Sequence, residues 1–268
     1  MVGFPEYIMY PDQLDEAYEG IDFNETDYFQ NVMNALHNER VKNMKKLDIP
    51  TNRTEWIYAP TTVNAYYSPP SNQIVLTAAI LQPPFYDASF PKSINFGSIG
   101  VFIGHELTHA FDDTGSLYDK YGNLHQWWKD STIKNFQEQA QCFVDQYSKY
   151  EVQDMKVNGH LTLGENIADN GGLKASFNAY QNWIARNHAE QPLPALPFTS
   201  NQLFFVAFAQ TWCKISTPEM ERFTILTDNH SPDKYRVIGT LSNSKDFAKE
   251  FKCHLKSTMN PQKKCEIW

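Results

Sequence analysis

The spacing of apolar residues predicts a mainly helical protein. Between residues 131 and 150, apolar positions recur every three or four residues and so fall on one face of an α-helix. Similar spacing predicts further helices over residues 26–47, 165–185, 201–213 and 244–252. We expect residues 1–25 and the polar stretch 48–55 to be irregular, and residues 82–95, which hold three prolines, to form a loop.

Helix starts and a small β-hairpin can also be predicted. Thr26 is a suitable N-cap, and Thr217 followed by Pro218 predicts another helix start, because proline is favoured at the first helical position. Residues 56–67 are rich in β-branched and aromatic side chains and predict one or two strands. The turn residues 68–72 and a strand over 73–77 complete a hairpin, so the fold class is mainly α with a small β-sheet.

An apolar stretch after this hairpin carries the sequence His105-Glu106-Leu107-Thr108-His109. On a helix, residues four apart lie on one face, so both imidazoles can bind one metal ion. Glu106 projects to the side, where it can reach a water beside the metal. The pattern is that of zinc peptidases, but it is short, and two inert histidines on a half-buried helix are the alternative.

Composition excludes some classes of partner. The chain has 268 residues, enough for a substantial core, and a formal net charge of −8, which argues against nucleic acid and anionic membranes as main partners. No apolar run reaches the roughly 18 residues that a membrane span needs. Residues 1–5 lack the charged start and apolar middle of a signal peptide.

The cysteines and sequons point toward the secretory pathway. Four cysteines occur and none forms a C-x-x-C pair, so disulfides are more plausible than thiolate zinc ligation, with four free core cysteines as the alternative. Asn24 and Asn52 begin N-x-[ST] sequons that can carry glycans in a secreted protein. Asn229 begins a third sequon, but Pro232 follows it, and we do not expect its use.

A catalytic zinc site usually takes a third protein ligand. Metzincins place glycine three and histidine six residues after the second histidine, where this chain has Asp112 and Gly115, so that class is excluded. Glu165 can supply the ligand from a later helix, with Asp169 one turn on accepting the second N–H of a zinc-bound histidine. Residues 162–165 also match a capping box, in which Glu165 would bond its own helix start.

A third polar stretch has the residue types that an acyl-transfer site needs. His230 can donate a hydrogen bond to the oxyanion that develops on a peptide carbonyl, and Asp228 can orient its ring. Arg236 can bind a substrate carbonyl. By themselves these residues are more typical of a polar surface loop.

The order of these pieces resembles the neprilysin-like family of zinc endopeptidases. The resemblance covers nearly the whole chain and is carried by residues 63–67, 73–75, 81–85, 105–113, 164–172, 208–213, 228–240 and 265–268. It implies a thermolysin-like (gluzincin) catalytic domain over residues 56–268, preceded by a helical lead-in segment over 1–55. It also implies one Zn²⁺ per chain, bound by His105, His109 and Glu165, with Glu106 as general base.

The resemblance assigns roles to further residues. Asp169 supports a zinc ligand, His230 stabilises the oxyanion, and Asp228 orients it. The substrate is held by Asn64 and Ala65 through its backbone and by Arg236 through a carbonyl. The pocket after the cleaved bond is lined by Ile80, Phe85, Val101, Phe102 and Trp212. Its apolar character predicts oligopeptide cleavage on the N-terminal side of hydrophobic residues.

The resemblance covers only the C-terminal, zinc-bearing portion of the family's pattern. The family's cytoplasmic tail, membrane anchor and helical N-terminal half have no counterpart here, although the full-length form is expected to be a plasma-membrane ectodomain or extracellular. The family's pairing joins Cys142 to Cys265, whereas Cys213 and Cys253 would pair with cysteines of the missing half. A truncated fragment that binds zinc, peptide or a partner without turnover is therefore the second hypothesis.

Overall fold

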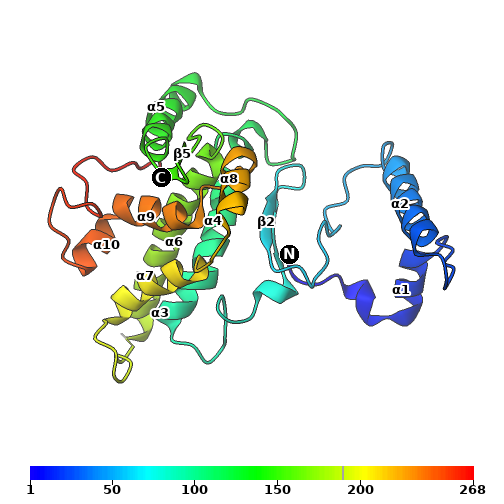
Figure 1. The fold of residues 1–268 in the computed structure, drawn as a ribbon, viewed down its shortest axis with the longest axis horizontal. Helices are drawn as coiled ribbons and strands as arrows, with labels where there is room; N and C mark the ends of the chain where they lie inside the picture. Colours follow the sequence, from blue (N-terminus) through cyan, green and yellow to red (C-terminus); the bar gives the residue numbers. More distant parts are fainter. Residues whose placement is uncertain (189) are drawn as a thin grey trace.

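A computed structural model describes residues 1–188 and 190–268, and it shows a helical body with a small sheet on one side (Figure 1). The body is built from α3 (Lys92–Asn95), α4 (Val101–His109), α5 (Asp130–Tyr147), α6 (Leu163–Asn187), α7 (Ser200–Thr211), α8 (Pro218–Thr227), α9 (Asp233–Asn243) and α10 (Lys245–Glu250). A π-helical turn over Phe96–Gly100 joins α3 to α4. Among the described residues, no helix has the length and apolarity that crossing a membrane requires.

The small sheet has the order β1-β3-β2. β2 (Ala65–Ser68) and β3 (Gln73–Thr77) form the predicted antiparallel hairpin, with Ala65 opposite Leu76. β1 (Val2–Gly3) pairs in parallel with the other edge of β3. Ala65 and Leu76 are buried in one apolar cluster with Ile80 and Ile99, which holds the sheet near the helix that carries the two histidines. A second hairpin joins β4 (Glu151–Val152) and β5 (Met155–Lys156).

The helical core has two larger apolar clusters. The first lies between α5, α6 and α9 and includes Phe136, Phe143, Tyr147, Ile167 and Tyr235. The second lies between α4, α6, α7 and α9 and includes Val101, Leu173, Phe177, Phe204, Phe205 and Phe208. Because α6 contributes to both clusters, it is the central helix of the body, and it fixes the position of α4 beside it.

α4 and α6 pack at close range through two glycines. A Cβ on Gly104 would lie 2.8 Å from the carbonyl oxygen of Gly172, and a Cβ on Gly172 would lie 2.5 Å from the backbone nitrogen of His105. Neither helix backbone can move aside without opening the core described above. The two glycines therefore set the distance between the helix of the histidines and the helix of Glu165.

Replacing Gly172 by alanine tests this contact. We expect the added methyl group to force α4 away from α6 and to lower the free energy of unfolding by about 1–3 kcal/mol, as overpacked cores do. Urea denaturation measures the effect. Asn178→Ala, at an exposed position of α6, is the matched control and is expected to change stability little. Equal stability of Gly172→Ala and the parent chain would contradict the close contact.

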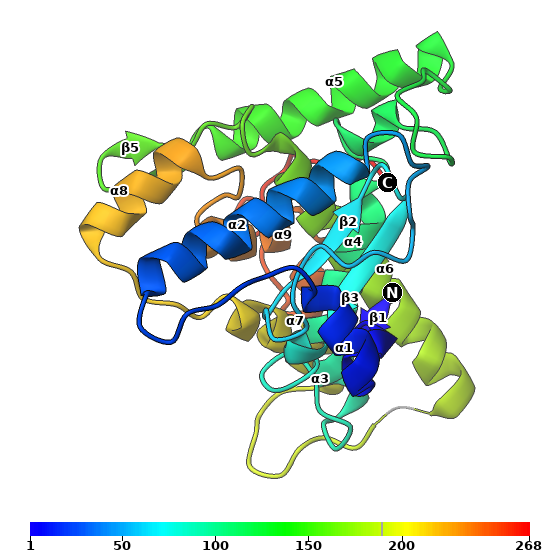
Figure 2. The ribbon, with the colours of Figure 1, turned by 90° about the vertical axis from the view of Figure 1, so that its right-hand side faces the viewer.

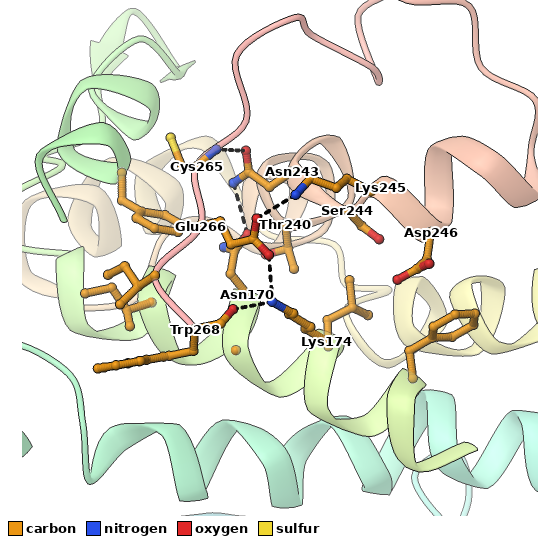
Figure 3. Close-up of a pocket in the computed structure, with 16 residues that line it drawn as sticks. Asn170, Lys174, Thr240, Asn243, Ser244, Lys245, Asp246, Cys265, Glu266 and Trp268 are labelled. Carbon is orange, nitrogen blue, oxygen red and sulfur yellow. Dashed lines mark hydrogen bonds and ion pairs between the residues drawn. The ribbon is translucent and has the colours of Figure 1, made fainter. Parts of the chain in front are cut away.

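The C-terminal segment is tied to the body by several bonds (Figure 3). Cys265 forms a disulfide with Cys142 on α5, which confirms the expected pairing. Lys174 on α6 donates to Glu266 at 2.6 Å and to the carbonyl of Trp268 at 2.5 Å, and Lys245 donates to Glu266 at 2.8 Å (Figure 3). Within the described residues, Cys213 and Cys253 are free thiols.

The N-terminal helices stand away from the body. α1 (Pro11–Tyr18) and α2 (Tyr28–Lys45) lie beyond the sheet, on the side opposite the helical core (Figure 1), and Figure 2 views the molecule from that side. Neither helix buries a side chain, and Phe29 on α2 is 73% exposed. The division into residues 1–55 and 56–268 stays a prediction, although β1 joins the sheet of the larger part.

Several predicted elements differ from the structure. The helix predicted from Thr26 begins at Tyr28, because Asp27 accepts the capping bond from the backbone N–H of Gln30. Residues 1–25 are not irregular, since they contain β1, α1 and a short 3₁₀ helix. Residues 56–64 form no strand, and the predicted loop 82–95 ends early, at the start of α3. α9 was not predicted, although Tyr235, Ile238 and Leu241 recur every three residues after Pro232.

Candidate metal centre and active site

The motif on α4 faces a cleft of about 500 Å³. The cleft is bordered by β2, by α4, by the first turn of α6 and by the loop before α9. His105, Glu106 and His109 reach it from α4, and Glu165 reaches it from α6. Asn64, Ala65, Phe102, His230 and Arg236, all predicted from sequence to belong to the site, also line it.

Three side chains converge on one point in this cleft. The Nε2 atoms of His105 and His109 lie 2.9 Å apart, and Oε2 of Glu165 lies 3.3 Å and 3.5 Å from them. The other ring nitrogen of each histidine meets a carboxylate. His105 Nδ1 lies 2.8 Å from Asp169, and His109 Nδ1 lies 2.7 Å from Asp112.

These contacts fit a metal cation. A neutral imidazole that donates its Nδ1 proton to a carboxylate keeps a lone pair on Nε2. The two Nε2 lone pairs then face each other and face Oε2 of Glu165, which is buried without a hydrogen-bond partner among the described residues. The three ligand atoms lie within 4.8 Å of one another. Two imidazoles and one carboxylate suit zinc with a fourth position open.

The electrostatics of the site also favour a cation. Burial by itself lowers the pKa of His109, but the carboxylates of Asp112 and Glu165 outweigh it and raise that pKa to about 10. Burial likewise acts against the charged form of Glu165, yet the two histidines hold the pKa of Glu165 well below its usual range. The cluster therefore stabilises positive charge next to an ionised carboxylate.

Glu106 lies beside this point without being one of the three converging groups. Its side chain is buried, with 5% of its surface exposed, and burial raises its pKa, while the two histidines partly oppose the rise. A carboxylate with a raised pKa accepts and returns a proton more readily near neutral pH. Its position fits the role of general base.

Asp169 connects His105 to a buried arginine. Nε and Nη2 of Arg236 donate to the two oxygens of Asp169 at 2.8 and 2.7 Å, and Asp169 also contacts the ring of His105. Burial would raise the pKa of Asp169, but Arg236 reverses this and lowers it to about 2. The guanidinium lies 3.9 Å over the ring of Trp212. Arg236 therefore fixes Asp169 through Nε and Nη2.

His230 and Asp228 are paired as the sequence suggested. Nδ1 of His230 lies 2.7 Å from Oδ1 of Asp228, which also accepts the backbone N–H of His230 at 2.9 Å. Nε2 of His230 points into the cleft, 3.2 Å from Oε2 of Glu165. The side chain is 42% exposed, so a substrate can reach the ring.

The capping-box alternative for Glu165 is wrong. Thr162 makes no side-chain cap bond. Its hydroxyl instead donates to the carbonyl of Asn158 and accepts from the side chain of Asn166. Glu165 is consequently free of the helix start and turns toward the histidines.

The five residues predicted to line a hydrophobic pocket lie in two layers, and of the five only Phe102 lines the cleft. Phe102 stacks on Trp212 with ring centroids 5.3 Å apart and meets Phe85 edge to face at 5.2 Å. These three rings form a continuous aromatic wall. Ile80 and Val101 are each 2% exposed and lie in the apolar clusters that support this wall.

Two residues of the site were not found from sequence. Asp112 holds the ring of His109 from the turn that follows α4, and its place only three residues after His109 was an available signal. Asn229 donates its side-chain amide to Oε1 of Glu165 at 3.1 Å. No local pattern marks Asn229, because its partner comes from a distant helix.

Comparisons with known proteins agree with this site. The family model described as "Peptidase family M13" matches residues 64–267. An endothelin-converting enzyme homolog from Locusta migratoria is 54% identical over 268 residues, which are 100% of this chain and 37% of that protein. Endothelin-converting enzyme 1 from Rattus norvegicus is 53% identical over 100% of this chain and 35% of that protein.

Solved structures give the same result for the fold. A crystal structure of a zinc metalloprotease from Mycobacterium tuberculosis, in complex with an inhibitor, superposes with a TM-score of 0.88. The two proteins are 36% identical in sequence, and the match covers 100% of this chain and 40% of the chain from Mycobacterium tuberculosis. This chain spans a little over a third of the length of the two endothelin-converting enzyme relatives described above. The predicted gluzincin fold and neprilysin-like family are confirmed, and the chain belongs to peptidase family M13.

Proposed function

We propose that this chain carries the catalytic centre of a zinc-dependent endopeptidase that cleaves oligopeptides. The observation that carries the proposal is the convergence of His105, His109 and Glu165 on one point, with Glu106 buried beside it. Family membership supports the same reaction class. Zinc held by the three side chains would supply a Lewis acid that polarises the peptide carbonyl and acidifies water.

The protein's own residues then have separate roles in the reaction. Glu106 takes a proton from the attacking water and returns it to the leaving amine. His230 donates a hydrogen bond to the oxyanion that forms on the carbonyl, and Asp228 keeps the ring in the orientation for that donation. Asp169 and Asp112 hold the rings of His105 and His109 so that both Nε2 atoms face the cleft.

The cleft also supports a mode of substrate binding. Among the described strands, β2 pairs with β3 alone, so its other edge is open to an extended peptide that adds as a further strand. Asn64 and Ala65 lie at the start of this edge and line the cleft. The aromatic wall of Phe85, Phe102 and Trp212 accommodates a hydrophobic side chain, which supports cleavage on its N-terminal side.

The activity of the whole protein is part of the proposal. The curated relatives are nearly three times as long as the matched region. By the family resemblance, Cys213 and Cys253 pair with cysteines of the N-terminal half, and the full-length form acts outside the cell or at its surface. Asn24 and Asn52 are both in exposed segments, as glycan acceptors must be.

A second candidate is a fragment that binds zinc or peptide without turnover. The apolar side chains that α2 exposes favour it, because such a surface is typical of a part separated from its partner. The metal centre itself does not distinguish the two candidates.

Cleavage of a quenched fluorescent peptide separates them. The zinc-loaded chain is expected to cleave a peptide with a central phenylalanine or leucine, to lose the activity with a chelator, and to regain it with Zn²⁺. A matched peptide with aspartate after the scissile bond is expected to be cleaved more slowly. A chain that binds zinc tightly but cleaves neither peptide would support the non-catalytic candidate.

A further inference from the structure

The loop before α9 is hydrogen-bonded to two consecutive residues in the first turn of α6, Glu165 and Asn166. Asn229 donates its side-chain N–H to Oε1 of Glu165 at 3.1 Å. Ser231 donates its hydroxyl to Oδ1 of Asn166 at 2.7 Å, in a bond between buried groups. The loop that carries His230 is thus placed directly against the metal ligand Glu165.

The two oxygens of Glu165 have different surroundings. Oε2 lies 3.3, 3.5 and 3.2 Å from the Nε2 atoms of His105, His109 and His230. Oε1 instead accepts the amide of Asn229. The last torsion of a glutamate is broad, so without a fixed donor the carboxylate can turn and exchange its oxygens.

We propose that Asn229 is a positioning residue for the metal ligand Glu165. Its amide occupies Oε1 and so leaves Oε2 as the single oxygen that faces the two imidazoles. This inference rests on the proposed function, because it assumes that Glu165 binds zinc. A hydrogen bond that fixes a ligating carboxylate tunes both the affinity for the metal and the geometry around it.

The amide of Asn229 is not needed to shape its own loop. Asp228 accepts the backbone N–H and the ring of His230, and Ser231 makes the buried bond to α6. The side chain of Asn229 is open to the cleft, so its replacement leaves the core untouched. A substitution at this position therefore changes the surroundings of Glu165 while the loop keeps its other bonds.

Two variants of the 268-residue chain test the inference by zinc binding alone. Asn229→Leu keeps the approximate size and removes the donor, and Asn229→Asp places a second carboxylate against Oε1. Competition with a chromophoric chelator is expected to show about tenfold weaker zinc binding for Asn229→Leu, within the range seen for such supporting contacts. Asn187→Leu, at the exposed end of α6, is the control and is expected to match the parent chain.

Asn229→Asp is expected to bind zinc less tightly than the parent, because Oε1 loses its donor and meets a like charge.

Cobalt substitution provides a readout that a structural role alone does not change. Once the donor is lost, Glu165 can bind through both oxygens, which raises the coordination number. The visible absorption bands of the Co²⁺-loaded Asn229→Leu chain are then expected to weaken and shift, because their intensity depends on coordination geometry. The Asn187→Leu spectrum is expected to equal that of the parent.

The outcomes separate this inference from the proposed function. A parent chain that binds no zinc would overturn the proposed function, and the inference with it. A parent chain that binds zinc, together with an Asn229→Leu variant of equal affinity and equal cobalt spectrum, would overturn the inference alone. Weaker binding with an altered spectrum, in a variant whose far-ultraviolet circular dichroism is unchanged, supports it.

Discussion

Glu106→Gln is expected to lower kcat for a peptide substrate by about 10²- to 10⁴-fold, the contribution typical of a positioned general base. Glutamine has the same shape but cannot take a proton from water. Zinc content is expected to stay at one ion per chain, because Glu106 is not among the three converging ligands. Turnover of a quenched peptide and metal analysis of the same preparation measure the two quantities.

Glu138→Gln is the matched control for this variant. Glu138 is an exposed glutamate on α5, so the same change of charge there is expected to leave kcat unchanged. Retained turnover in Glu106→Gln would refute the assignment of the base. Loss of zinc from Glu106→Gln would show instead that this carboxylate helps to hold the metal.

Asp169→Asn is expected to have the largest effect on stability. The change removes the counter-charge of Arg236, whose guanidinium is buried and bonded to both oxygens of Asp169. Leaving a buried charge unpaired costs about 3–5 kcal/mol. The acceptor for the ring of His105 is also weakened, and zinc affinity is expected to fall by about 10- to 100-fold.

Urea denaturation and chelator competition measure these two effects separately. Asp145→Asn on α5 is the control, because Asp145 is exposed and accepts a bond only from Gln141 among the described residues. The double variant Asp169→Asn with Arg236→Met is expected to recover part of the lost stability, since no buried charge remains. A single variant within about 1 kcal/mol of the parent chain would contradict the buried ion pair, because exposed pairs contribute that little.

The start of α8 was predicted correctly from the chemistry of its cap. Thr217 caps α8 by accepting the backbone N–H of Met220, and Pro218 is its first residue, as predicted. One or two strands were predicted over residues 56–67, and the part before Ala65 was wrong because composition alone supported it. Tyr58 instead packs edge to face on Tyr66, and Tyr66 accepts the backbone N–H of Ile57, so these aromatic residues serve contacts outside the sheet.

In the candidate site, too, some residues could be placed from local spacing, whereas others depend on contacts with distant segments. The spacing of His105 and His109 follows from one turn of helix, so the sequence was enough to predict that both rings point toward one position. The capping box at Thr162 was a valid local pattern that tertiary contacts overrode, because Glu165 turns toward the histidines and the Thr162 hydroxyl bonds Asn158 instead.

The sequence by itself determined the residue types, their helical spacing and the family to which they point. Only the tertiary structure decided how those residues meet. The close packing of Gly104 against Gly172 brings Glu165 and Asp169 up to His105. The physical reason is that hydrogen bonds such as those of Arg236 with Asp169, and of Asn229 with Glu165, join segments far apart in the chain. Periodicity describes one element at a time and carries no information about such partners.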